Sequence, residues 1–329
     1  MTIGHVGNRP INLDEGFEEV GFRINGAKAP SLSFSRGSID HEYRLTKTVV
    51  TVGQWFEFVQ AFTPSAQDVL TAGRVDSGFT DFIGRSIRVK NFGRPPGVDP
   101  IYEIAPAANP NGPAIGMSWR FAARYVNWLN NGKALTRDAF SNGAYDETTF
   151  DPDTRKFDQA THNTGAQFWI PTLDEMLKGV YYDPNRYGHA IEGYWRQPDG
   201  GNEPLVSGRP GEVGAETSAG VISISPSEIS VGSYPGVLSP LGLLDVSGGG
   251  NQLTEELRTF AILRMTVGTA PGMLPFDIID NLGGLGLLDI GQTGLRIASV
   301  VPAPGGVVLL VVLGCCAGVR RQSRTNRNT

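Results

Sequence analysis

The chain has 329 residues, and its apolar content of 40% is enough for a substantial buried core, which excludes a wholly disordered protein. Charged residues make up only 19%, while 43 glycines and 22 prolines favour turns and short strands over long exposed helices. The formal net charge of −5 leaves no sustained basic stripe ahead of the C-terminal residues. These features exclude an electrostatic basis for nucleic-acid binding in the body of the chain.

The first clear element is a strand that leads into a helix. Residues 41–51 have the β-branched, alternating pattern of a strand, and Thr51 is a good helix N-cap. Pro64 then predicts the end of the helix. The apolar face of this helix is expected to consist of Trp55, Phe56, Phe58, Val59 and Phe62.

Two further helices are predicted, both with a structural role in the core. Ser118 is placed to cap the first, whose apolar face recurs at helical spacing. The second follows a strand that begins at Phe168 and passes through Pro171 and Thr172. The apolar residues of the earlier helix are Phe121, Ala122, Tyr125, Trp128 and Leu129.

A loop rich in Pro, Gly, Asp and Asn follows, from Asp183 to Pro204. Its aromatic and amide side chains could stack on a sugar or peptide and hydrogen-bond to it. The same side chains could equally be packing residues, and both interpretations stay open. The candidates are Tyr194, Trp195, Arg196, Asp199 and Asn202.

The order of these segments resembles the formylglycine-generating (sulfatase-modifying) family. The matching motifs begin with Gln54-Trp-Phe-Glu-Phe-Val, Ile115-Gly-Met-Ser-Trp and Ile170-Pro-Thr-Leu-Asp-Glu, and continue with Val231-Gly-Ser-Tyr-Pro and Gly294-Leu-Arg-Ile-Ala-Ser. The resemblance covers about residues 41–299. It implies an α+β, C-type-lectin-like fold with short strands, two or three helices and long loops, over a domain of residues 1–300.

Enzymes of that family hold copper through paired cysteines near the C-terminal end of the domain. The corresponding region here, about Leu257 to Arg296, contains no cysteine, and the only two in the chain are the adjacent Cys315 and Cys316. Soft Cu(I) needs thiolate ligands. We therefore predict no formylglycine-generating activity, no copper and no catalytic residue of the family type.

Calcium stays open in the resemblance. Where the family has a loop that supplies calcium ligands, this chain has Gly248-Gly-Gly-Asn-Gln, with Gln252 in place of a glutamate. Asn251, Glu255 and Glu256 could still coordinate a hard cation through oxygen. The alternative is a glycine turn that precedes a solvated charged segment.

The four histidines, His5, His41, His162 and His189, are widely separated and match no metal-ligand spacing such as HExxH. An isolated histidine is more often a hydrogen-bonded structural residue than a catalytic one. We predict no zinc site and assign none of the four a catalytic role.

The last residues differ in kind from the rest. Residues 297–319 carry no charge, and Arg320 and Arg321 follow them. An apolar helix that begins near Gly305 would have about 15 residues, fewer than the roughly 20 that span a bilayer comfortably. The arginines should stay cytoplasmic, which places residues 1–300 outside the cell.

This tail, residues 301–329, resembles a PEP-CTERM sorting signal of bacterial surface proteins. The proline motif is Pro302-Ala303-Pro304, in which Ala303 replaces the usual glutamate. The resemblance implies recognition by an exosortase-type machinery, cleavage near the motif, and display at the cell surface or in the extracellular matrix. The alternative is a tail retained as a transmembrane anchor. Residues 1–8 lack a leader pattern, so for an exported protein we expect the true start to lie upstream.

With the family's chemistry removed, the leading interpretation is an exported binding or structural module that contacts the membrane through its tail, with a glycan or peptide as candidate ligand. One alternative is an enzyme, either of the formylglycine-generating type or with a different site. A pocket lined by perturbed carboxylates or a histidine would indicate the different site. The other is a passive matrix component without a pocket.

Overall fold

A computed structural model describes most of the chain. The described residues are 1–12, 23–24, 27–28, 35–65, 83–95, 98–150, 158–222, 224, 228–258, 263–273, 277–279, 281–285 and 292–302. Residues 303–329 of the predicted tail lie outside this range.

A four-stranded antiparallel sheet joins the two ends of the described body. Its order is β1-β4-β14-β7, so that β14 lies between β4 and β7. Ala298 on β14 pairs with Leu45 on one side and with Trp169 on the other. The strands are β1 (Thr2–Ile3), β4 (Tyr43–Leu45), β14 (Ala298–Val300) and β7 (Phe168–Trp169).

The larger sheet has six strands in the order β13-β10-β11-β12-β2-β3. The pairs β10–β13 and β12–β2 are parallel, and the other neighbours are antiparallel. Its strands are β13 (Thr293–Gly294), β10 (Asn251–Arg258), β11 (Leu263–Val267), β12 (Asn281–Leu285), β2 (Arg23–Ile24) and β3 (Ala27–Lys28). Two small ladders pair β5 (Ile87–Val89) with β6 (Tyr102–Ile104) and β8 (Tyr182–Asp183) with β9 (Gly193–Tyr194).

Helix α1 (Val52–Phe62) begins where its cap predicts. The Thr51 hydroxyl accepts from the backbone N–H of Gln54, and the Gln54 side chain accepts from the backbone N–H of Thr51. This reciprocal capping box satisfies two amide groups that the helix itself leaves unpaired. Helix α4 (Trp119–Asn130) likewise begins after Ser118, whose hydroxyl accepts from Phe121 N.

Helix α6 (Leu173–Tyr181) has a second capping box, formed by Thr172 and Glu175. The predicted helix starts are thus confirmed at all three sites. The described residues also contain the short helix α5 (Arg137–Ser141), so they hold four α-helices where the sequence predicted two or three. No described helix has both the length and the apolar character that crossing a membrane requires.

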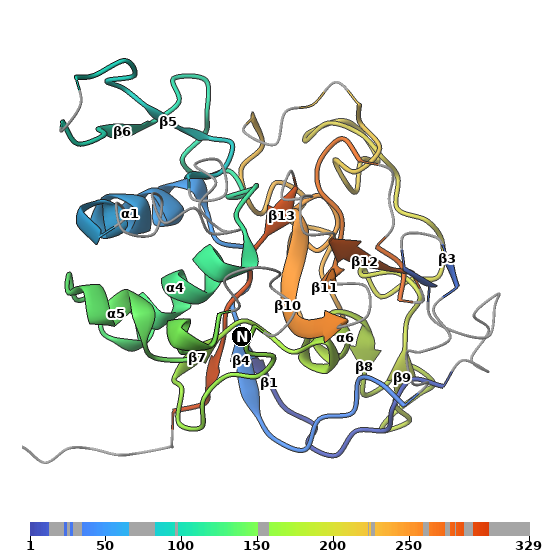
Figure 1. Cartoon of the computed structure of the whole chain (residues 1–329). Coiled ribbons are helices and arrows are strands. Elements are labelled where there is room, and N and C mark those ends of the chain that lie inside the picture. The colour runs from blue at the N-terminus through green and yellow to red at the C-terminus, as the bar shows by residue number, and fades with distance from the viewer. Residues whose placement is uncertain are drawn as a thin grey trace, which may run out of the picture.

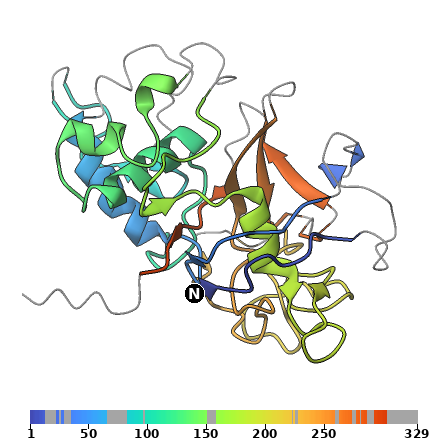
Figure 2. The same cartoon turned by 90° about the horizontal axis from the view of Figure 1, so that it is seen from below.

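The helices α1, α4 and α5 gather on one side of the molecule, and the β10–β11–β12 sheet lies on the other with α6 beneath it (Figure 1 and Figure 2). Aromatic rings fill the space between α1, α4 and α5. Phe58 lies at their centre, within 4.9 to 6.1 Å of the rings of Trp55, Phe62, Tyr125, Trp128 and Phe140. The fold is therefore α+β, with the aromatic side chains of the predicted helices in its core.

Candidate functional site

An open pocket of about 650 Å³ lies at the end of the four-stranded sheet. The strand order explains its position. Because β14 lies between β4 and β7, three parts of the chain meet at one place. They are His41 and Glu42 just before β4, Trp169 of β7, and the end of β14. The pocket is lined by His41, Glu42, His162, Thr164, Gly165, Ala166, Trp169, Val300, Val301 and Pro302.

His41 is held in this pocket by a buried carboxylate. Its Nε2 lies 3.2 Å from Glu175 Oε1, and its Nδ1 lies 3.1 Å from Oδ1 of the exposed Asp40. Glu175 is itself fixed, since Trp169 Nε1 donates to its Oε2 at 3.0 Å. The backbone N–H of Thr172 donates to the same oxygen at 2.8 Å. The glutamate of the α6 capping box is thus also the partner of a pocket histidine.

His162 has a carboxylate partner of its own. Its Nδ1 lies 2.9 Å from Glu255 Oε1, and the Tyr145 hydroxyl donates to the same oxygen at 2.6 Å. The ring stacks on Trp169, with centroids 4.7 Å apart and planes inclined by 18°. With Nδ1 engaged, Nε2 is the ring nitrogen that His162 can offer to a ligand.

The carboxylates favour the cationic form of both rings. The hydrogen bond that His41 donates to Glu175 raises the pKa of His41 from its usual value to about 9, although burial acts in the opposite direction. Burial lowers the pKa of His162, but the hydrogen bond and charge of Glu255 and the charge of Glu175 outweigh it, so this pKa also lies above its usual value. The pocket thus presents two histidines whose positions are set by buried acids, and these acids favour the cationic form of each ring.

The three calcium candidates, Asn251, Glu255 and Glu256, have different partners in the structure. Glu255 is buried and serves Tyr145 and His162, whereas Glu256 Oε2 pairs with Arg36 Nη2 at 3.1 Å. Asn251 Nδ2 lies 3.9 Å from the sulfur of Met273. Within the described ranges, no group of three or more His, Cys, Asp or Glu side chains is arranged to hold a metal ion.

Residues 1–302 contain none of the thiolates with which the formylglycine-generating family holds copper. In the region where the sequence resemblance led us to look for copper ligands, the described strand β11 carries Arg264, Met265 and Thr266 in succession. Residues 1–302 contain no cysteine at all. Cys315 and Cys316 lie outside the described residues, as do Ala303, Pro304, Arg320 and Arg321 of the predicted sorting signal.

The predicted ligand loop is only partly open to solvent. Tyr194 is buried, and its hydroxyl donates to the carbonyl of Gly37 and accepts from Asn8 Nδ2. Trp195 is half-buried, with its Nε1 donating to Asp183 and the guanidinium of Arg186 over its ring. Arg196 and Asp199 are also half-buried, and Asn202 is exposed. None of the five lines the pocket that contains the histidines.

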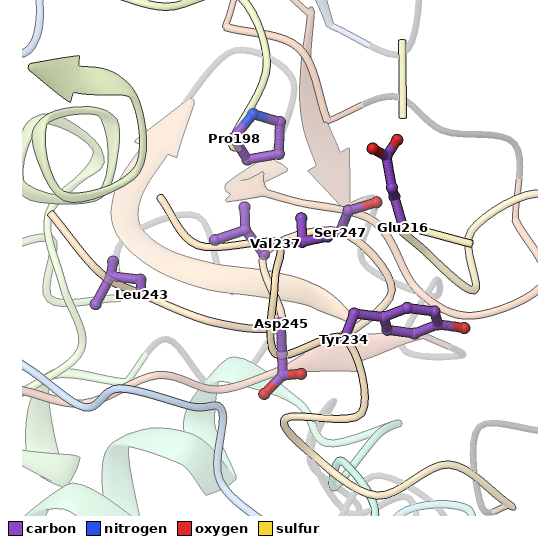
Figure 3. Close-up of a pocket in the computed structure, with 8 residues that line it drawn as sticks. Pro198, Glu216, Tyr234, Val237, Leu243, Asp245 and Ser247 are labelled. Carbon is purple, nitrogen blue, oxygen red and sulfur yellow. The ribbon is translucent and has the colours of Figure 1, made fainter. Parts of the chain in front are cut away.

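A second hollow, drawn in Figure 3, has a volume of only about 10 Å³, room for roughly one water molecule. Asp245 contributes to its wall with a left-handed backbone (φ 57°), and its carboxylate points away from Pro198 in Figure 3. Burial raises the pKa of this carboxyl. A hollow of this size cannot hold an organic ligand.

The residues that make up the site were not predicted from the sequence. His41 and His162 were interpreted as isolated histidines, and Glu175 was part of a helix start. Their positions in the sequence follow no motif spacing. They come together only in the folded chain, through strand pairing and the stacking of His162 on Trp169. Glu255 was a candidate calcium ligand, whereas in the structure it is the partner of His162.

No protein-family model matches the chain, and no curated protein matches it. Among the solved structures that are similar is one described as "Crystal Structure of CarF", with a TM-score of 0.46 and 14% sequence identity. The alignment covers 92% of this chain and 98% of that chain. The likeness is too slight to define the fold or the function further.

Proposed function

We propose that this chain is an exported binding module that holds its ligand in the pocket between His41 and His162 and has no formylglycine-generating activity. One observation carries the proposal: two histidines that line one open pocket are each held by a buried carboxylate. Buried acids that fix the orientation of pocket side chains are typical of a preorganised site. Histidines that only fill a core do not need to line an open pocket.

We propose for the scaffold a C-type-lectin-like fold of the sulfatase-modifying type. The proposal is supported by the order of the sequence motifs and by the long connections between short strands, which could carry a ligand site on a compact scaffold. The lack of cysteine in residues 1–302 supports the loss of the family's oxidation chemistry.

Binding can be tested with a variant that fills the pocket. Thr164 is exposed at the pocket rim, so Thr164→Trp should obstruct the pocket without altering the core. Thr161→Trp is the matched control, since Thr161 is exposed on the same loop but does not line the pocket. A glycan and peptide array probed with labelled protein should give signals that Thr164→Trp abolishes and Thr161→Trp retains. Signals equal in all three proteins would refute a ligand site in this pocket.

For the tail, we propose that residues 301–329 direct the protein to an exosortase-type machinery and hold it at the membrane at least transiently. The full chain, produced in a bacterium that has such a machinery, should be recovered from the cell surface or the matrix. The mass of the recovered protein distinguishes cleavage near Pro302 from a retained anchor. Recovery only from the cell interior would contradict this proposal.

A second candidate function is an enzyme that uses His162 as a general acid. The ion pair of His162 with Glu255 in an open pocket favours it, because a histidine with a raised pKa can donate a proton at neutral pH. A ligand identified on the array should then be converted by the wild-type protein and left unchanged by His162→Gln. An unchanged ligand in both cases supports the binding module.

A further inference from the structure

We propose that the pocket selects a glycan through the carboxylate of a single uronic acid residue, bound between His41 and His162 and flanked by neutral sugars. This inference rests on the proposed binding function and names its ligand class. Two imidazole rings line one open pocket, and each has one nitrogen engaged by a buried carboxylate.

The buried acids prepare each ring to donate outward. Glu175 and Glu255 each offset the charge of one imidazolium, so the ring can stay cationic without binding a solvent anion. His162 then has Nε2–H as its remaining donor, and the second donor of His41, Nδ1–H, lies against the exposed Asp40. Two such donors in one pocket match the two oxygens of a carboxylate, to which charged donors bind more strongly than neutral ones.

The exposed Asp40 already occupies the outward nitrogen of His41. Its Oδ1 lies 3.1 Å from Nδ1, and its side chain is 98% exposed. An ion pair with so exposed a partner contributes little to stability. A ligand carboxylate can therefore replace Asp40 at His41 at small cost, and Asp40 acts as a weak competitor for the site.

The remaining pocket wall favours a sugar ring over an acidic peptide. Glu42 and the Thr164 hydroxyl can pair with sugar hydroxyls, and Val300, Val301 and Pro302 offer an apolar surface to the C–H face of the ring. A peptide with several acidic side chains would bring them close to Asp40 and Glu42, which repel further negative charge. Trp169 is buried beneath His162, so it supports the imidazole and is not itself the stacking platform.

The charged groups that face the histidines determine the pH dependence. Asp40 and Glu175 contact His41, Glu255 contacts His162, and Glu42 lies on the same wall. Arg264 lies behind Glu255 and donates to its backbone carbonyl. A uronate is ionised above about pH 4, as are other carboxylic acids of this kind. Binding should be strongest above about pH 4 and below the pH at which the histidines lose their protons. For His41 this upper limit is set by its pKa of about 9.

The probe is a trisaccharide with one central glucuronate between two neutral sugars, and its methyl ester is the uncharged control. Calorimetry with the full chain at pH 6 should show binding of the acid, at least about tenfold weaker binding of the ester, and about tenfold weaker binding of the acid at pH 10. His162→Gln, which keeps a hydrogen-bonding group near Glu255 but cannot become cationic, should lose affinity by about tenfold. His162→Phe, which keeps the stacking on Trp169, should lose it to a similar extent.

Asp40→Asn provides a readout in the opposite direction. Removing the competing carboxylate should strengthen binding of the acid by about threefold, whereas a site for a cation would be weakened by the same change. The matched control is His189→Gln, since His189 is exposed and does not line the pocket. Its affinity should equal that of the wild type.

The outcomes separate this inference from the proposed function. Equal binding of acid and ester, or binding of an acidic hexapeptide in place of the trisaccharide, would overturn the uronate assignment. If such binding is still blocked by Thr164→Trp, the pocket remains a ligand site. If no array ligand and neither trisaccharide binds at pH 6, both the uronate assignment and the binding module are refuted.

Discussion

His162 stacks on Trp169, and each of the two rings donates to a different buried glutamate. His162 Nδ1 lies 2.9 Å from Glu255, and Trp169 Nε1 lies 3.0 Å from Glu175. Glu175 is in turn 3.2 Å from His41. One stacked pair therefore connects β10, α6 and the residues before β4. Loss of the Glu175 charge should lower the pKa of both His41 and His162.

The pKa of His41 should depend on Glu175. In the wild type we expect an NMR titration midpoint of about 9, and in Glu175→Gln a midpoint near the usual value of about 6.5. Glutamine preserves the capping box, because its amide can also accept from the backbone N–H of Thr172. Proton NMR of the imidazole Cε1–H provides the measurement. A wild-type midpoint near 6.5 would contradict the ion pair.

Stability should fall at alkaline pH for the same reason. Because the folded pKa of His41 is raised, its contribution is fully present below about pH 6.5 and is lost as pH rises through about 9. The side chain is half exposed, so screening by solvent keeps the contribution small. Urea midpoints measured at pH 6 and pH 10 should therefore differ more in the wild type than in Glu175→Gln.

Tyr145→Phe should destabilise the protein by about 1–3 kcal/mol, the usual cost of leaving buried groups without a hydrogen-bond partner. The Tyr145 hydroxyl donates to Glu255 at 2.6 Å and accepts from the backbone N–H of Ile170 at 3.0 Å. The matched control is Tyr187→Phe, since Tyr187 is exposed. Urea unfolding measures both. A Tyr145→Phe protein as stable as the wild type would show that this network adds nothing to stability.

Asp158→Ala should destabilise the protein by about 3–5 kcal/mol, the range expected when one partner of a buried ion pair is removed. Asp158 accepts from Nε and Nη2 of Arg120, and both side chains are buried. The double variant Arg120→Met with Asp158→Leu should recover most of the loss, because no charge is then left buried and unpaired. Thermal unfolding of the three proteins tests this, and a double variant no better than Asp158→Ala would contradict it.

Phe58→Ala should cost about 3–5 kcal/mol, since it removes a fully buried ring at the centre of the aromatic core. Phe92, on the connection between β5 and β6, is 91% exposed, and Phe92→Ala should change stability by no more than about 0.5 kcal/mol. The same substitution at two positions thus separates burial from residue type. Denaturant unfolding with a common slope provides the comparison.

The helix N-caps show which part of the fold could be predicted from the sequence. They are Thr51, Ser118 and Thr172. A capping hydroxyl acts on an amide three residues away, so its position marks the helix start whatever the rest of the chain does. The order of the strands was not predicted in this way. Glycine-rich β12 lies inside the six-stranded sheet, and only pairing with β11 and β2 places it there.

Local sequence patterns are enough to predict the helix starts and the aromatic faces that form the core, and residues 1–302 hold no thiol. Tertiary contacts bring His41 and His162 into one pocket and make Glu255 the partner of a histidine. Caps and helix faces can be predicted because they depend on neighbours only a few residues away. The pocket depends on β14 pairing with both β4 and β7, which joins segments far apart in the chain.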